Sequence, residues 1–154
     1  MTPEETAEDT PNRSGWESEQ QRLDEQRQQR AEEDARCEEL RKWISWRLAH
    51  ELIKSDLIGL YEEVDKLVKT LPKEPITPLQ LKIANDFLVR AKALLSGDTT
   101  VDQVEIFVGA AKMPEYRDVI IVLRQIRQGL ERFEAKNKFI FTSKFDDQLE
   151  EYNL

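Results

Sequence analysis

Apolar side chains recur every three or four residues from Tyr116 to Phe133, and this is the most regular pattern in the chain. The series consists of Tyr116, Val119, Leu123, Ile126, Leu130 and Phe133. Such spacing places one apolar stripe along an α-helix, with the heptad geometry of helices that pack side by side in bundles and coiled coils. Pro114 stands just before the series, where a helix can begin. The pattern predicts a long packed helix and an all-α fold.

A second periodic stretch runs from Leu40 to Leu71, where Pro72 and Pro75 end it. We expect its apolar residues to face a core: Leu40, Trp43, Ile44, Leu48, Leu52, Ile53, Leu57, Leu60, Tyr61, Val64, Leu67, Val68 and Leu71. Ser55 and Asp56 interrupt the pattern and are residue types that cap helices. The stretch is therefore either one long helix with a bend or two helices.

Two capping patterns predict further helix starts. Thr77 can accept a hydrogen bond from an unpaired backbone amide, Pro78 suits the first turn, and Gln80 completes a capping box. An apolar stripe then leads to Gly97, which can take the left-handed conformation that ends a helix: Ile83, Ala84, Phe87, Leu88, Ala91, Leu94 and Leu95. Thr100 with Gln103 repeats the pattern, and predicts a short helix with these side chains inward: Val104, Phe107, Val108 and Ala111.

Residues 1–36 form an acidic extension, with eleven acids, five bases and −6 of the chain's net charge of −8. We expect disorder from Met1 to about Gly15 and a charged helix from Glu17 to Arg36, because that second stretch lacks Gly and Pro. Its apolar residues are too sparse for a stable coiled coil. The predicted organisation is this extension, a compact bundle of four to five helices over residues 37–137, and a short aromatic and acidic tail over residues 138–154.

The residue types needed for catalysis or metal binding are scarce. The chain has one histidine, His50, and one cysteine, Cys37, so a single copy cannot assemble a zinc site from Cys and His. The five glycines stand apart, whereas phosphate-binding loops cluster them. We expect no catalytic residue, no cofactor and no metal ion. The unpaired cysteine and the absence of a long apolar run predict a cytoplasmic protein that does not insert into membranes.

Two clusters of aromatic side chains are candidate protein interfaces. Trp43, Trp46 and Arg47 combine large aromatics with a base, a mixture typical of interface hot spots and also of platforms that stack nucleic-acid bases. Packing of the same tryptophans in the core is the interpretation that we favour. The tail carries the second cluster, Phe145, Leu149 and Tyr152, which either binds in a partner's groove or closes the chain's own bundle.

A short basic stripe lies on the helix predicted from the 116–133 pattern. Arg117 and Arg124 are seven residues apart and share a face, with Arg127 nearby. The stripe either keeps the helix soluble, or contacts an acidic partner or a phosphate backbone. We therefore expect a non-enzymatic protein-interaction or assembly module, a subunit of a larger complex or of a homo-oligomer. The alternative is a nucleic-acid-associated subunit that contacts phosphate through these arginines.

Overall fold

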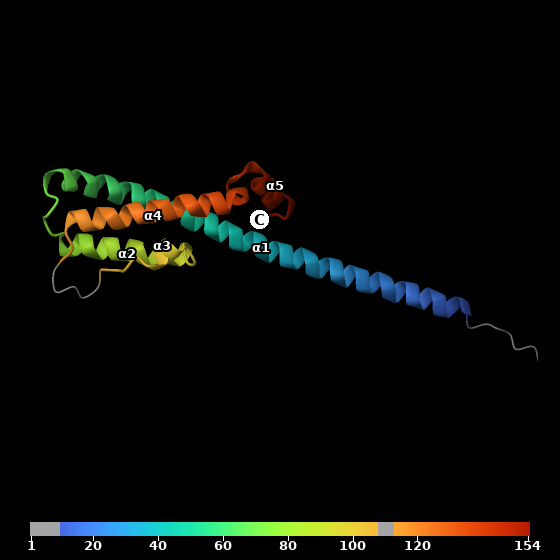
Figure 1. The fold of residues 1–154 in the computed structure, drawn as a ribbon. Helices are drawn as coiled ribbons and strands as arrows, with labels where there is room; N and C mark the ends of the chain where they lie inside the picture. Colours follow the sequence, from blue (N-terminus) through green and yellow to red (C-terminus); the bar gives the residue numbers. More distant parts are fainter. Residues whose placement is uncertain (1–9, 108–112) are drawn as a thin grey trace, which may run out of the picture. The chain divides into compact units, whose positions relative to one another are not determined.

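The computed structural model describes residues 10–107 and 113–154, with side chains from Ser14 onward. The fold is all-α, as predicted: the described residues form five α-helices and one 3-10 helix, and no strand (Figure 1). In chain order they are α1 (Thr10–Thr70), α2 (Pro78–Leu94), α3 (Thr99–Asp102), α4 (Tyr116–Lys136), η1 (Lys138–Phe141) and α5 (Ser143–Glu151). The chain divides into two compact units, one up to Arg41 and one from Lys42 onward.

Helix α1 is one uninterrupted helix of 61 residues. It continues through Ser55 and Asp56 without a second start, which decides between the two predicted arrangements. The Asp56 carboxylate lies 2.7 Å from the Arg90 guanidinium of α2, so it forms an ion pair instead of a cap. The helix ends at Thr70, just before Pro72 as predicted, but begins at Thr10 and so includes part of the stretch for which we expected disorder.

The first unit consists of the N-terminal part of α1, and the prediction for residues 1–9 lies outside the described residues. Every side chain from Ser14 to Ala35 is exposed. Ion pairs one turn apart, Glu19 with Arg22 at 3.7 Å and Asp24 with Arg27 at 3.9 Å, support the helix on its surface. Exposed pairs of this kind contribute only a few tenths of a kcal/mol each, roughly.

The core of the second unit lies where α2 and α4 run alongside the C-terminal part of α1 (Figure 1). All three helices contribute one apolar stripe to a continuous buried cluster, and α3 with its flanking loops adds a few side chains. Its members are Ile53, Leu57, Val64, Ile76, Phe87, Leu88, Ala91, Leu95, Val101, Val104, Tyr116, Val119, Ile120, Leu123, Ile126 and Leu130. The predicted stripe of α4 is therefore confirmed up to Leu130.

The capping prediction for α2 is also confirmed. The Thr77 hydroxyl oxygen accepts a hydrogen bond from the Gln80 amide at 3.2 Å, and Gln80 Oε1 accepts one from the Thr77 amide at 2.9 Å. The Tyr116 hydroxyl donates to the same Gln80 oxygen at 2.9 Å, which ties the start of α2 to the start of α4. At the other end, Gly97 adopts φ 95°, the left-handed conformation that glycine favours.

The predicted helix from Thr100 to Ala111 is wrong in start and length. The carboxylate of Asp98, not the Thr100 side chain, caps α3, and it accepts the Thr100 and Val101 amides at 3.1 Å each. The helix ends at Asp102. Beyond it, Asn85 of α2 donates to the Phe107 carbonyl at 2.8 Å and accepts from the Phe107 amide at 3.0 Å, so α2 supplies the hydrogen bonds that a helix would have made. Val108 and Ala111 lie outside the described residues.

Candidate functional site

The two predicted aromatic clusters meet each other within the second unit. Trp43 of α1 makes edge-to-face contacts with Phe139 of η1 and Phe145 of α5, at ring-centroid distances of 5.9 and 6.3 Å. Trp46 contacts Phe133 of α4 in the same geometry, at 6.1 Å. Together with His50 and Phe141, these rings form what we call the aromatic cluster, which fastens residues 138–154 to α1 and α4.

The candidate interface residues of the tail differ in how far they are buried. Phe145 is fully buried, and it reaches a partner only if α5 leaves α1. Arg47 holds α5 in place: its Nη1 donates to the Asp146 carboxylate at 2.6 Å, and its guanidinium lies 5.9 Å from the centre of the Phe145 ring. Leu149 and Tyr152 stay half-buried, as do Trp43 and Trp46. Of the two arrangements expected for the tail, closure of the chain's own bundle is the one seen.

His50 lies inside the aromatic cluster and is 3% exposed. Its ring stacks on Phe133 at 5.8 Å and meets Phe141 at 4.7 Å. Nε2 lies 2.9 Å from Glu134 Oε1, and Nδ1 has no hydrogen-bond partner. Burial lowers the pKa of His50 below its ordinary value, although the nearby Glu134 carboxylate opposes that shift.

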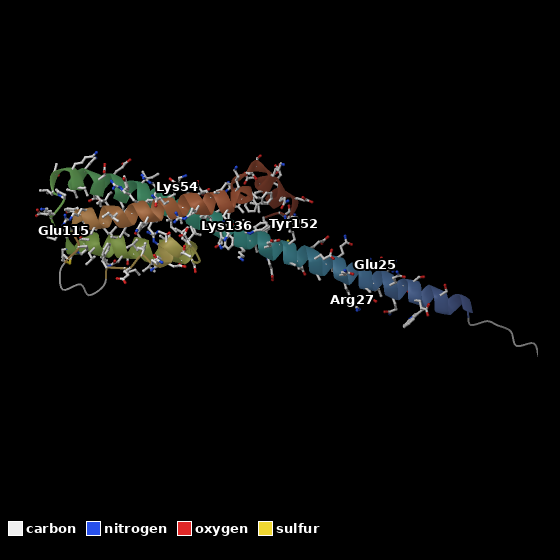
Figure 2. The ribbon with its side chains drawn as sticks, viewed as in Figure 1. Glu25, Arg27, Lys54, Glu115, Lys136 and Tyr152 are labelled. Atoms are coloured by element: carbon white, nitrogen blue, oxygen red, sulfur yellow. The ribbon has the colours of Figure 1, made fainter. Side chains whose placement is uncertain are left out.

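Lys54 shares the Glu134 carboxylate with His50. Its ammonium donates to Oε1 at 3.0 Å, on the part of α1 that runs beside α4 (Figure 2). Because Lys54 is positive, it adds to the effect of burial and further disfavours the protonated imidazole. Glu134 thus connects α4 to His50 and Lys54 of α1 at the edge of the packed core.

The three arginines of the predicted basic stripe contact different kinds of side chain. Arg117 pairs with Glu115 at 2.6 Å. Arg124 Nε donates to the Tyr61 hydroxyl at 3.2 Å, and the Arg127 guanidinium lies over the Tyr61 ring at 5.0 Å. The Arg124 hydrogen bond lowers the pKa of Tyr61. Within the described residues, neither Arg124 nor Arg127 has a carboxylate within ion-pair distance.

A groove of about 430 Å³ lies between α1 and α4 next to Tyr61. Its floor is apolar, and its rim mixes both signs of charge: the lining consists of Lys54, Leu57, Ile58, Tyr61, Glu62, Arg127, Leu130, Glu131, Glu134. The three glutamates of this rim oppose the binding of an anion, so the geometry favours phosphate less than the arginines alone would.

The assignment of Leu48 and Leu52 to the core is wrong. They are 55% and 64% exposed, whereas Ile53 and Leu57 on the same helix are buried. An α-helix turns by about 100° per residue, so Leu48 and Leu52 point away from Ile53 and Leu57. Ile83 of α2, also expected inward, is 46% exposed.

Leu48 and Leu52 belong to a surface that we call the outward face of α1. It consists of Ile44, Ser45, Leu48, Leu52, Ser55 and Gly59, which share one side of the helix by spacing. Ile44 is half-buried and the other five are exposed. Between Ile44 and Gly59 no charged residue lies on this arc, in a chain of which 35% is charged. A helical wheel of the sequence alone would have separated this face from the core stripe.

No group of three or more His, Cys, Asp or Glu side chains suited to a metal ion is found in the described part of the chain. No helix in residues 10–107 and 113–154 is both long enough and apolar enough to cross a lipid bilayer. Comparison of the chain with protein families, with curated proteins and with solved structures finds no match.

Proposed function

We propose that the chain is a non-enzymatic protein-interaction or assembly module that binds its partner through the outward face of α1. The observation that carries this proposal is a pair of exposed leucines, Leu48 and Leu52, on a face that has no charge from Ile44 to Gly59. Charged residues are depleted, and apolar ones enriched, at the centre of protein interfaces. Contiguous exposed apolar patches mark such sites on proteins. Action as a subunit in the cytoplasm is part of the same proposal.

The aromatic cluster is a secondary candidate contact. The half-buried Trp43 and Trp46 still present part of their rings, and Leu149 and Tyr152 lie on the adjoining segment. Trp43 packs on Phe139 and Phe145, and Trp46 packs on Phe133, so a partner that displaced Phe145 from Trp43 would compete with α5. The interface role of these residues stays a prediction, and it ranks below the outward face of α1.

Capture of partners from native lysate tests the proposal. We expect the intact chain to retain a protein that the double variant Leu48→Glu with Leu52→Glu loses, and nuclease treatment to leave that capture unchanged. Leu79→Glu is the matched control, since Leu79 is 68% exposed on α2 and stands outside the face. Equal capture by all three proteins, each with an intact circular dichroism spectrum, would contradict the proposal.

A nucleic-acid-associated subunit is the second candidate, and one observation favours it. Arg124 and Arg127 keep their charge unpaired by any carboxylate of the described residues, next to an aromatic ring. Phosphate contacts through arginine weaken steeply as salt is raised. Binding of single-stranded nucleic acid that falls with salt, fails in Arg124→Glu and survives in Arg90→Glu would support this candidate. No binding at low salt would remove it.

A further inference from the structure

We infer that the partner on the outward face of α1 is a second copy of this chain, packed antiparallel to the first about Leu52. The inference rests on the proposed function and names the occupant of the surface. Most soluble oligomers are symmetric homo-oligomers, and a two-fold dimer brings the same patch of both copies together. A face that is complementary to a second copy of itself in one orientation therefore indicates a homodimer more than a general apolar binding surface.

Two small residues of the face lie at equal distances from Leu52. Ser45 lies seven residues before Leu52 and Gly59 seven residues after it. In an antiparallel pair centred on Leu52, the Ser45 of one copy lies opposite Gly59 of the other, and the two Leu52 side chains meet. Leu48 then lies over the small Ser55 side chain, four and three residues from the centre.

Small residues at both ends of this contact allow the two helices to approach closely. A methyl group placed on the Gly59 α-carbon would meet nothing within 4 Å, so the space outside it is open for a partner's side chain. Ser45 and Ser55 are likewise exposed. Large side chains near the centre of the contact can then pack against small ones toward its ends. Close helix packing requires such interdigitation.

Charges at the two ends of the face select the antiparallel orientation. Arg41 precedes Leu52 by eleven residues, and Glu63 follows it by eleven. Both side chains are exposed. Antiparallel packing sets each base against the other copy's acid, whereas parallel packing would oppose Arg41 to Arg41 and Glu63 to Glu63. Opposite-charge pairs across an interface fix its register, and like-charge pairs are unfavourable.

Disulfide trapping tests the orientation directly. In a Cys37→Ser background, a mixture of Ser45→Cys and Gly59→Cys chains should oxidise to a cross-linked pair joining position 45 to position 59, identified by peptide mass spectrometry. Ser45→Cys alone should not cross-link, since its two copies lie at opposite ends of the contact, beyond the roughly 7 Å that a disulfide spans between α-carbons. A cross-link between two copies of position 45 would mean parallel packing and would overturn the inference.

The oligomeric state and the charge pair provide the second measurement. Light scattering should give twice the monomer mass, falling to the monomer mass in Leu52→Glu but not in Leu79→Glu. Arg41→Glu and Glu63→Arg should each weaken the dimer, and the two together should restore it, because the swap keeps opposite charges facing. Failure of the double variant to recover would contradict the antiparallel register.

Failure of the inference and failure of the proposed function have different outcomes. A strict monomer at the highest soluble concentration overturns the inference. If that monomer still captures another protein in a manner that depends on Leu48 and Leu52, the proposed function stands with a different partner. If it captures none, both fall.

Discussion

The two sides of α1 carry the same kind of side chain in opposite surroundings. On the inward side Leu57 is 3% exposed, and on the outward face Leu52, five residues earlier, is 64% exposed. The inward side meets matching stripes on α2 and α4, as the buried cluster shows. The outward face has no such counterpart in the described residues. Angular position on the helix, more than residue type, therefore decides which leucines are buried in the core and which stay exposed.

The largest expected effect comes from removing the inward leucine. Leu57→Ala should lower the free energy of unfolding by about 2–5 kcal/mol, because it removes buried apolar area and leaves a cavity. Leu52→Ala should change it by no more than about 0.5 kcal/mol in the monomer. Urea unfolding followed by circular dichroism measures both.

The protein concentration sharpens this first test. In a dilute sample the Leu52→Ala effect should be near zero, and it should grow with concentration if the outward face self-associates, since association stabilises the folded chain by mass action. The Leu57→Ala effect should not depend on concentration in this way. Equal losses for the two variants at all concentrations would erase the distinction between the faces.

Replacing two glycines with alanine should change the stability by smaller amounts and in opposite directions, one in the core and one on the outward face. On the inward side, a methyl group at Gly129 of α4 would lie 2.6 Å from Val101 Cγ2, so Gly129→Ala should destabilise the fold by about 1 kcal/mol net, from overpacking less the gain in helix propensity. At Gly59 the space is open, and Gly59→Ala should stabilise the dilute monomer by about 0.5–1 kcal/mol. Thermal unfolding of the pair measures the sign. A gain at both positions would show that α3 moves aside easily.

Local chemistry explains which parts of the fold were predictable from sequence. The start of α2 followed from Thr77 and Gln80, because a capping box uses neighbouring residues only. The continuity of α1 through Asp56 was left open by the sequence, and the ion pair of Asp56 with Arg90 joins residues that are distant in the chain. Asn85 likewise holds the segment that ends in Phe107 through two hydrogen bonds. The two residues are 22 positions apart, too far for a local sequence pattern to predict the contact.

The candidate surfaces show the same limit. Periodicity placed Leu48 and Ile53 in one apolar series, although residues five apart lie about 140° apart around a helix. A helical wheel separates the two faces, and the packing of α2 and α4 shows which of them is covered. The aromatic residues of the tail were visible in the sequence as a group. Their contact with Trp43 spans about a hundred residues of chain, so sequence left open whether they bind a partner or the chain itself.

The smallest expected effect concerns pH, and it acts on the inward side alone. Among the described residues, His50 is the buried polar side chain of the second unit, and its pKa is lowered by burial and by Lys54, against the opposing carboxylates of Glu134 and Glu51. Below about pH 6.5 the unfolded chain therefore binds a proton that the folded chain resists. This contribution to stability is complete above that pH and is lost as the pH falls toward the lowered pKa.

Removing the imidazole isolates this contribution from the many exposed carboxylates. His50→Phe and His50→Gln should both lose less stability than the parent between about pH 7.5 and about pH 5, in urea unfolding at each pH. The phenylalanine keeps the stacking on Phe133, and the glutamine keeps polarity, so agreement between them assigns the effect to the missing proton site. Outward variants such as Leu52→Ala should follow the parent's pH profile. A parent-like profile in both His50 variants would instead assign the pH dependence to surface carboxylates, and would mean that Glu134 already compensates the buried imidazole.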